Sequence, residues 1–178
     1  MENDLVEIVK EAGLLHDIGK IGIREDILNK PGNLTMDEYE IMKGHVENAV
    51  NIIRHLPSLD YVIPTVYSHH EHYNGSGYPR KLKGEEIPVM GRVLCIADSF
   101  DAMTSMRSYK KPISAEQAIE ILREEAGKQF DPKLSLIFID LVKSGKIEIR
   151  GQIASEPPSP YDPYENNFDF NIEEVNLD

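Results

Sequence analysis

The chain has 178 residues, of which 40% are hydrophobic and 28% are charged, a composition typical of one soluble globular domain. Acidic residues outnumber basic residues by 31 to 19, and the net charge of −12 argues against a protein that coats nucleic acid or binds an anionic membrane surface. No apolar run reaches the roughly 18 residues that cross a bilayer, and the N-terminus lacks the pattern of a secretion signal. The single cysteine, Cys95, excludes an intramolecular disulfide. We therefore expect a cytoplasmic protein that binds neither DNA nor RNA and does not insert into a membrane.

Apolar residues at helical spacing predict helices through the first part of the chain. A helix is predicted over residues 2–16, where apolar residues recur every three or four positions. Thr35 and Glu38 have the spacing of a capping box, so a second helix is predicted from residue 35 to about residue 56. A third helix is predicted over residues 59–70.

The second half of the chain shows the same pattern. An apolar stretch predicts a buried helix over residues 89–104, and a second capping box predicts a helix over 114–126. A capping aspartate before a proline starts the last predicted helix, which covers residues 131–142. The only strand signal is short and covers residues 146–150. The predicted fold class is all-α, with about five to six helices in one domain over residues 1–146.

The C-terminal part differs in composition from the rest of the chain. Residues 151–178 contain seven acids, four prolines and no lysine or arginine, and their apolar residues are too sparse to form a core. We predict a disordered acidic tail or linker over residues 147–178. A short docking motif near its end, in the segment NNFDFNIEEVNLD, is the less favoured alternative.

Histidines and aspartates stand in positions that suit a transition-metal site. Neutral imidazole and carboxylate groups are ligands for iron, manganese or zinc. His16 and Asp17 are adjacent and offer both kinds of ligand. His69 and His70 would diverge by about 100° on a helix, so both can bind only if two metals, or a metal and a substrate, lie near them. Asp98 stands on an otherwise apolar helix, where a buried carboxylate needs a metal, a base or a cap.

The remaining histidines have simpler interpretations. A single buried histidine such as His45 is more often a hydrogen-bonded core residue than a metal ligand. His55 and His72 have no partner in the pattern and are interpreted as surface or packing residues. The metal hypothesis therefore depends on the whole set and not on any one member.

Several segments, in order along the chain, resemble one known family. Residues 14–20 (LLHDIGK) resemble the HD signature of metal-dependent phosphohydrolases. Residues 69–79 (HHEHYNGSGYP) resemble the HHExxDGxGYP signature of the HD-GYP subfamily. Residues 96–110 and 127–132 resemble its later blocks, so the resemblance covers roughly residues 5–143.

This resemblance implies a phosphodiesterase that hydrolyses cyclic di-GMP to pGpG or GMP at a centre of two or three metals, usually iron or manganese, with zinc as an alternative. The metal ligands that it implies are His16, Asp17, His45, His69, His70 and Asp98. The catalytic residues that it implies are Asp17, Lys20 and Asp101. The substrate-binding residues that it implies are Lys20, Tyr78, Arg107 and Lys110, with Tyr78 offering its ring to a base.

Two features depart from the family pattern. The family places a further histidine on a helix upstream of the HD pair, whereas none of the fifteen residues before His16 is a histidine. We therefore expect a chain that is truncated at its N-terminus, or one piece of a split or degenerate protein, with slow, metal-dependent turnover. We also expect an apolar groove that a second copy or a fused or partner signalling domain covers. The second departure is Asn74 in place of an aspartate, for which we expect a modest effect. The alternatives are a catalytically weak metal- and nucleotide-binding module and a phosphohydrolase of another nucleotide.

Overall fold

The computed structural model describes residues 2–106, 111–147 and 149, which form a bundle of helices without a strand. The α-helices are α1 (Glu2–Leu15), α2 (Glu25–Leu28), α3 (Met36–Lys43), α4 (His45–Ile53), α5 (Ile63–Val66), α6 (Val89–Thr104), α7 (Ala115–Glu124) and α8 (Pro132–Lys143). Short 3-10 helices are η1 (Ile18–Gly22), η2 (Pro57–Val62) and η3 (Gly84–Glu86). The predicted all-α fold is confirmed, and the helices beyond the five or six expected are short segments.

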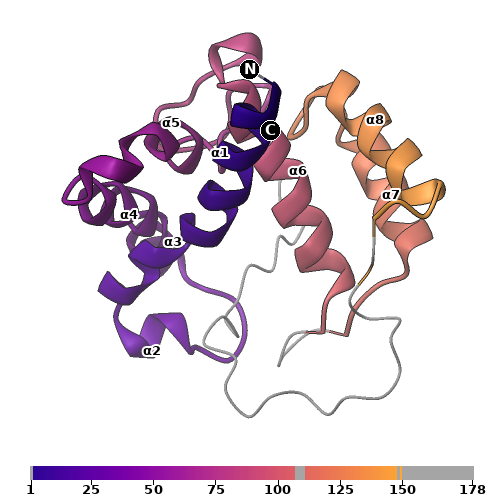
Figure 1. Ribbon diagram of the computed structural model, residues 1–178. Coiled ribbons are helices and arrows are strands. Elements are labelled where there is room, and N and C mark those ends of the chain that lie inside the picture. Colours follow the sequence, from indigo (N-terminus) through magenta and orange to yellow (C-terminus); the bar gives the residue numbers. More distant parts are fainter. Residues whose placement is uncertain (1, 107–110, 148, 150–178) are drawn as a thin grey trace, which may run out of the picture.

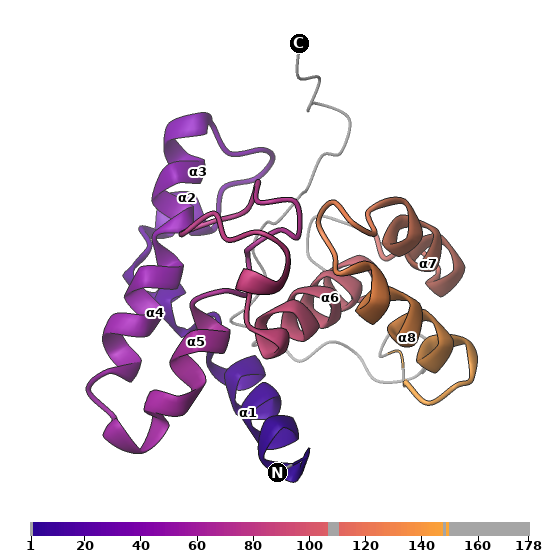
Figure 2. The same ribbon diagram turned by 90° about the horizontal axis from the view of Figure 1, so that it is seen from above.

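Helix α6 lies between two groups of helices (Figures 1 and 2), with α1, α4 and α5 on one side and α7 and α8 on the other. Its residue Leu94 belongs to a hydrophobic cluster with residues of α1, α4, η2 and α5. Its residues Ile96 and Phe100 belong to a second cluster with residues of α7 and α8. Because α6 contributes to both clusters, it holds the two halves of the bundle together.

The predicted capping residues begin three of the helices. The Thr35 side chain accepts a hydrogen bond from the backbone N–H of Glu38, whose carboxylate accepts one in return from the backbone N–H of Thr35. Ser114 caps α7 in the same way. The carboxylate of Asp131 accepts bonds from the first backbone N–H groups of α8. These bonds satisfy N–H groups that have no partner inside the helix.

Two predicted helices differ from the structure. The helix predicted over 35–56 is divided at Gly44 into α3 and α4. The helix predicted over 59–70 is wrong in its second half, because α5 ends at Val66 and residues 67–70 form a turn. The Ser68 hydroxyl donates to the backbone carbonyl of Pro64 at 2.7 Å and packs on Gly91 of α6, which fixes this turn.

Two predictions concern residues at the C-terminal end. Of the strand predicted over 146–150, residues 146, 147 and 149 are described and do not form a strand. The other two residues lie outside the described part. The tail predicted for residues 147–178 also lies outside it, apart from Ile147 and Ile149. These two isoleucines pack against the cluster that α6, α7 and α8 share.

Candidate metal centre

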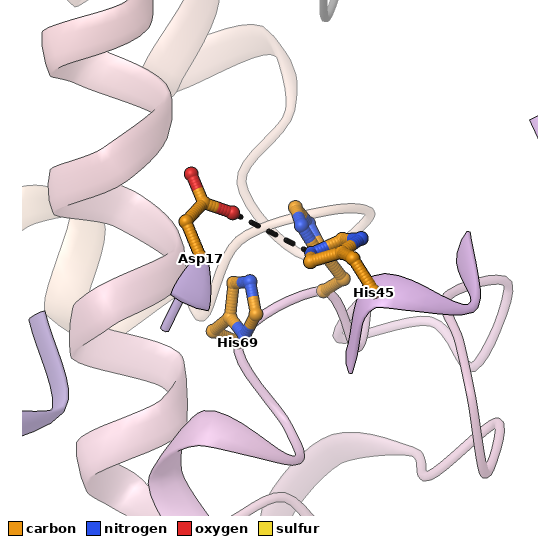
Figure 3. Close-up of side chains that lie close together, drawn as sticks. Asp17, His45 and His69 are labelled. Atoms are coloured by element: carbon orange, nitrogen blue, oxygen red, sulfur yellow. Dashed lines mark ion pairs between the residues drawn. The ribbon is translucent and has the colours of Figure 1, made fainter. Parts of the chain in front are cut away.

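Four side chains from three separate segments meet in one cluster. Asp17 stands between α1 and η1, His45 begins α4, and His69 and His70 lie in the turn after α5. One potential ligand atom from each of these residues lies within 4.8 Å of the others. Figure 3 shows Asp17 facing His45, with His69 beside them. The turn that replaces the predicted helix directs both neighbouring histidines into one cluster, with ring centroids 4.0 Å apart.

Asp17 lies between two groups of candidate ligands. Its Oδ1 atom is 3.5 Å from Nε2 of His45, and its Oδ2 atom is 3.2 Å from Nε2 of His16. The same nitrogen of His16 is 3.7 Å from Oδ1 of Asp98 on α6. The structure therefore brings together all six residues that the sequence suggested as metal ligands.

Three of the histidines share one hydrogen-bonding arrangement. Nδ1–H of His16 donates to the carbonyl of Gly13 at 2.8 Å, and the corresponding atoms of His45 and His69 donate to carbonyls three residues earlier, at 2.8 and 2.6 Å. This bond fixes the tautomer of a neutral imidazole, because the carbonyl only accepts and the proton must stay on Nδ1. In each neutral ring Nε2 is then the atom available to bind a metal.

Buried polar atoms in the cluster indicate that it fits a metal. The His69 residue is only 1% exposed, and its Nε2 atom is buried without a hydrogen-bond partner. Buried nitrogen atoms of native proteins nearly always have a partner, and an ion is one way to supply it. Imidazole nitrogens grouped around a carboxylate form the donor set that transition metals prefer.

Burial keeps three of the imidazoles uncharged. Burial, together with the neighbouring His16 and His45, lowers the pKa of His69 to about 3. Burial likewise lowers the pKa values of His45 and His70. These three rings are neutral at physiological pH, which is the form that binds a metal.

His16 has the opposite electrostatic environment. Its burial lowers its pKa, but hydrogen bonds and charge interactions with Asp17 and Asp98 outweigh this effect and raise the pKa to about 10. Burial opposes ionisation of Asp17, yet His16 and Lys20 hold the pKa of this carboxyl well below its usual range. The metal-free cluster therefore contains a positive imidazolium balanced by carboxylates.

A close contact between η1 and α4 positions one part of the cluster. A Cβ atom on Gly19 would lie 1.9 Å from the backbone carbonyl oxygen of His45, so only glycine allows this approach. The next residue, Lys20, donates from Nζ to Oδ2 of Asp17 at 2.8 Å. The packing of η1 on α4 thus places a carboxylate and an ammonium group beside the histidines.

The loop after His70 is held by a residue that the sequence analysis did not single out. The Glu71 carboxylate, 2% exposed, accepts bonds from the backbone N–H groups of Arg80 at 2.7 Å and Leu82 at 3.0 Å. At Gly77 a Cβ atom would lie 2.2 Å from the backbone nitrogen of His72. The sequence signal for Glu71 was its position as the glutamate of the HHExxDGxGYP signature.

The Tyr78 ring lies against the cluster. It stacks on the His70 ring with centroids 4.8 Å apart and an interplanar angle of 23°. Tyr78 is only 9% exposed, and Tyr39 packs edge-on against it. The ring is therefore largely covered, which favours support of His70 over the predicted stacking on a substrate base.

Three other residues that the sequence analysis discussed have hydrogen-bond partners outside the cluster. The Asn74 side-chain oxygen accepts bonds from the backbone and the hydroxyl of Ser76, so the amide closes the turn without a charge. His72 lies beside the same serine, with Nδ1 3.0 Å from its hydroxyl. His55 is exposed, and its Nδ1 donates to the carbonyl of Asn51 at the end of α4. His55 and His72 therefore lie outside the cluster, in agreement with their interpretation as surface or packing residues.

Of the remaining predicted site residues, the structure describes Asp101, which does not join the cluster. Asp101 is exposed on α6, one turn after Asp98, and its carboxylate accepts a bond from the Ser105 hydroxyl at 3.0 Å. Arg107 and Lys110 lie outside the described residues, so their role as substrate-binding residues stays a prediction.

The chain is similar in sequence to known proteins. The sequence matches the HD domain family over residues 1–134. It is 43% identical over 145 residues to a cyclic di-GMP phosphodiesterase of Thermotoga maritima, covering 80% of this chain and 39% of that protein. It is also 43% identical over 136 residues to 3'3'-cGAMP-specific phosphodiesterase 2 of Vibrio cholerae, covering 75% of this chain and 26% of that protein.

A solved structure has a similar fold. The crystal structure of a cyclic GMP-AMP specific phosphodiesterase of Vibrio cholerae superposes with a TM-score of 0.58 and 23% identity. The superposition covers 78% of this chain and 38% of that one. The present chain thus spans less than half the length of each of these relatives.

Family membership follows from the extent of the match and from the cluster. Among the described residues, no helix is both long enough and apolar enough to cross a membrane. The HD pair, His16 and Asp17, and the histidines that begin the GYP segment lie in one cluster. The chain belongs to the HD domain family, in its HD-GYP branch.

Proposed function

We propose that this chain is a metal-dependent phosphodiesterase that hydrolyses cyclic di-GMP. The observation that carries the proposal is the position of Asp17, whose two carboxylate oxygens lie near different imidazoles, Oδ1 near His45 and Oδ2 near His16. A carboxylate in this position can bind two metal ions at once. Similarity to phosphodiesterases of cyclic dinucleotides gives the substrate class.

We infer that the six residues of the cluster would hold two metal ions, with Asp17 as a ligand available to both. One ion would be held by His45, His69 and His70 on the side of Oδ1. The other would be held by His16 and Asp98 on the side of Oδ2. Iron or manganese suits this mixture of imidazole and carboxylate, and zinc is a further candidate. Such a pair of ions supplies Lewis acidity and activates water for attack on a phosphodiester.

Lys20 has the position expected of a phosphate-binding residue. Its ammonium group is held 2.8 Å from the Asp17 carboxylate and is mostly buried, with 13% of the side chain exposed. A fixed positive charge beside the centre neutralises the charge that develops on a phosphoryl group during hydrolysis. We assign this role to Lys20, and to Asp17 the role of orienting the ammonium group.

A second candidate substrate follows from the comparisons. One relative at 43% identity is specific for 3'3'-cGAMP, the mixed dinucleotide of guanine and adenine. The two substrates share the phosphodiester that the metal centre would cleave. They differ in one base, so the metal cluster itself does not distinguish them.

The proposal is tested by metal loading and turnover of the full chain. Protein freed of metal is loaded with Mn²⁺, Fe²⁺ or Zn²⁺, and hydrolysis of cyclic di-GMP and 3'3'-cGAMP is followed by chromatography of the products. We expect pGpG or GMP to form only in loaded samples. Exposed His55, outside the cluster, offers a matched control, because His55→Ala should hydrolyse as fast as the unmodified chain. A loaded protein that cleaves no cyclic dinucleotide would contradict the proposal.

A further inference from the structure

The last turn of helix α3 lies next to the metal cluster. Met42, in this turn, accepts through its backbone carbonyl the hydrogen bond from Nδ1 of His45, at 2.8 Å. Its neighbour Lys43 is the last residue of α3, and the ammonium group of Lys43 lies over the Tyr78 ring. Tyr78 in turn stacks on the His70 ring. This turn of α3 therefore contacts one proposed metal ligand directly and a second one through a tyrosine.

Two tyrosine rings lie beside the ammonium group of Lys43. Its Nζ atom is 5.1 Å from the ring centroid of Tyr39, one turn earlier on the same helix, and 5.7 Å from that of Tyr78. The face of an aromatic ring carries partial negative charge, so an ammonium group within about 6 Å of its centroid is attracted to it. Tyr39 also packs edge-on against Tyr78, with centroids 6.3 Å apart. Lys43 thus attracts both rings and favours their contact.

The partial burial of Lys43 makes its contacts with the rings more important than its ion pair. Its side chain is 24% exposed, and attraction between a cation and a ring is stronger where water is excluded. The ammonium group also pairs with Glu40 at 2.5 Å, but the Glu40 side chain is 61% exposed. Exposed ion pairs contribute little to stability. The contacts with the rings are therefore the ones through which Lys43 acts on the site.

The Tyr78 ring limits how the His70 ring can turn. The two rings are stacked with centroids 4.8 Å apart and an interplanar angle of 23°, so a large tilt of one ring requires a movement of the other. A histidine binds a metal well only when the residues around it fix the direction of its ring. A residue that holds Tyr78 in place therefore also fixes the direction of the His70 ring.

We propose that Lys43 is a positioning residue of the metal centre, which fixes the His70 ring by holding Tyr78 against it. This inference rests on the metal centre of the proposed function, but it does not depend on which dinucleotide is hydrolysed. It assigns a role to a residue of α3 that lies outside the segments resembling the HD-GYP family.

Three substitutions separate the ring contacts of Lys43 from its ion pair. Lys43→Met keeps the apolar stem and removes the charge, whereas Lys43→Arg keeps a cation that also packs on aromatic faces. Glu40→Gln removes the ion pair and leaves the ammonium group over the rings. Competition with a chelating dye measures the manganese affinity of the full chain. We expect Lys43→Met to lower this affinity about three- to tenfold, Lys43→Arg to restore it, and Glu40→Gln to leave it unchanged.

Lys30→Met is the matched control for the loss of a lysine that pairs with α3. The Lys30 side chain is 30% exposed and pairs with Glu38, in the first turn of α3, at 2.6 Å. It therefore matches Lys43 in burial and in its ion pair but acts on the other end of the helix. We expect Lys30→Met to leave the manganese affinity unchanged. A loss equal to that of Lys43→Met in either Lys30→Met or Glu40→Gln would overturn the inference.

The visible absorption of bound Co²⁺ gives a readout of the ligand geometry, on which the energies and intensities of its bands depend. We expect Lys43→Met to change the spectrum of the cobalt-loaded chain and Lys43→Arg to restore it. An unchanged spectrum with an unchanged metal affinity would overturn the inference. A higher KM for cyclic di-GMP with an unchanged spectrum would mean that Lys43 contacts the substrate, which also contradicts a positioning role.

A measurement on the metal-free chain keeps the inference testable if no metal binds. While the two rings are stacked, the ring current of Tyr78 shifts the NMR signals of the His70 ring protons. In Lys43→Met we expect these signals to move towards those of a free histidine, and in Lys43→Arg to return. This result in a chain that takes up no metal would support the role of Lys43 in the stack and contradict the proposed phosphodiesterase. Identical His70 signals in Lys43→Met and the unmodified chain would overturn the inference.

Discussion

At the scale of single residues, the centre depends on how its imidazole rings are held before any metal binds. His16, His45 and His69 each donate from Nδ1 to the carbonyl three residues earlier. Each ring is thus oriented by its own segment and needs no neighbour to direct its Nε2 atom. A preorganised ligand set reduces the entropy lost on binding.

Substitutions in the cluster should reduce metal content in a graded way. We expect the unmodified chain to hold more than one equivalent of iron, manganese or zinc. His69→Ala removes a ligand of one group, whereas Asp17→Ala removes the residue between both groups and should abolish turnover. Even the loss of a supporting residue costs about 10–100-fold in affinity or activity, so both losses should be at least this large.

Elemental analysis by mass spectrometry measures these contents, and His55→Ala serves as the control. A protein that neither contains nor takes up metal would contradict the metal centre. Equal metal contents in Asp17→Ala and the unmodified chain would contradict the position assigned to Asp17.

Asp131 should contribute to stability in a pH-dependent manner. Its side chain is 4% exposed, caps α8 and pairs with Arg92 of α6. Burial opposes its ionisation, but the backbone N–H groups of α8 and Arg92 outweigh this and lower its pKa. We expect Asp131→Ala to reduce the free energy of unfolding by about 3 kcal/mol at neutral pH.

The sign of the pH dependence follows from the lowered pKa. The contribution of Asp131 is complete above the unfolded pKa of about 3.9 and is lost as the pH falls through the lower folded pKa. Urea unfolding at neutral pH and near pH 3 measures this. The difference in the free energy of unfolding between Asp131→Ala and the unmodified chain should become smaller near pH 3. A larger difference there would contradict the lowered pKa of Asp131.

Some residue roles were accessible from the sequence and others were not. Asp98 could be singled out because a carboxylate on an apolar helix needs a partner. The role of Glu71 in holding the loop could not be predicted, since the backbone N–H groups that it binds belong to residues 80 and 82. Their positions depend on the course of the loop. The covered position of Tyr78 likewise depends on Tyr39, which is distant in sequence, and on the course of the loop that folds its ring back onto His70.

At the scale of elements, the packing of η1 on α4 controls the cluster. Gly19→Ala would place a Cβ atom 1.9 Å from the His45 carbonyl oxygen, so the two elements must separate. We expect Gly19→Ala to lower the free energy of unfolding by about 1–3 kcal/mol. It should also lower the affinity for metal, because Asp17 and His45 move apart.

Gly13 of α1 provides the matched control for this substitution. A Cβ atom there would meet only Leu94 Cδ1 at 3.7 Å, an ordinary contact. Gly13→Ala inside a helix should stabilise the chain by about 0.5–1 kcal/mol and leave metal content unchanged. Thermal unfolding with and without manganese measures both variants. Equal stability and metal binding of Gly19→Ala and Gly13→Ala would show that the close approach of η1 to α4 does not determine the geometry of the cluster.

Elements with strong local signals could be predicted from the sequence. Helix α6 has the bounds predicted for it, and the capping residues Thr35, Ser114 and Asp131 mark the starts of α3, α7 and α8. The turn at residues 67–70 could not be predicted from the sequence, because it depends on the contact of Ser68 with Gly91 of α6. The prediction that both histidines of the turn need two metals or a substrate therefore started from the wrong local geometry.

At the scale of the whole molecule, the acidic C-terminal segment is predicted to be separable from the domain. Deleting residues 155–178 removes most of its acids but retains Ile147 and Ile149, which pack on the core of α6, α7 and α8. We expect the thermal midpoint and metal content to stay nearly unchanged. Scanning calorimetry and elemental analysis of the shortened chain measure this, and a large fall in the midpoint would mean that the segment packs on the domain.

The oligomeric state also stays a prediction. Several apolar side chains of α1 and η1 are exposed, among them Leu14 at 76% and Ile21 at 82%. Exposed apolar groups of this kind suit an interface with a second copy or another domain. Sedimentation velocity distinguishes a monomer from a dimer. A dimer that Ile21→Lys dissociates would support the interface, and a monomer at all concentrations would contradict self-association.

The distribution of the cluster along the chain gives the metal a further part, as a cross-link. The proposed ligands come from four stretches, beginning at residue 16 and ending at residue 98. An ion held by them closes long loops in the folded chain that are open in the unfolded one. A free ion at 100 times its dissociation constant adds about 2.7 kcal/mol to stability by mass action. The folded population of this protein would therefore follow the supply of metal, and a chelator would act on the protein as a mild denaturant.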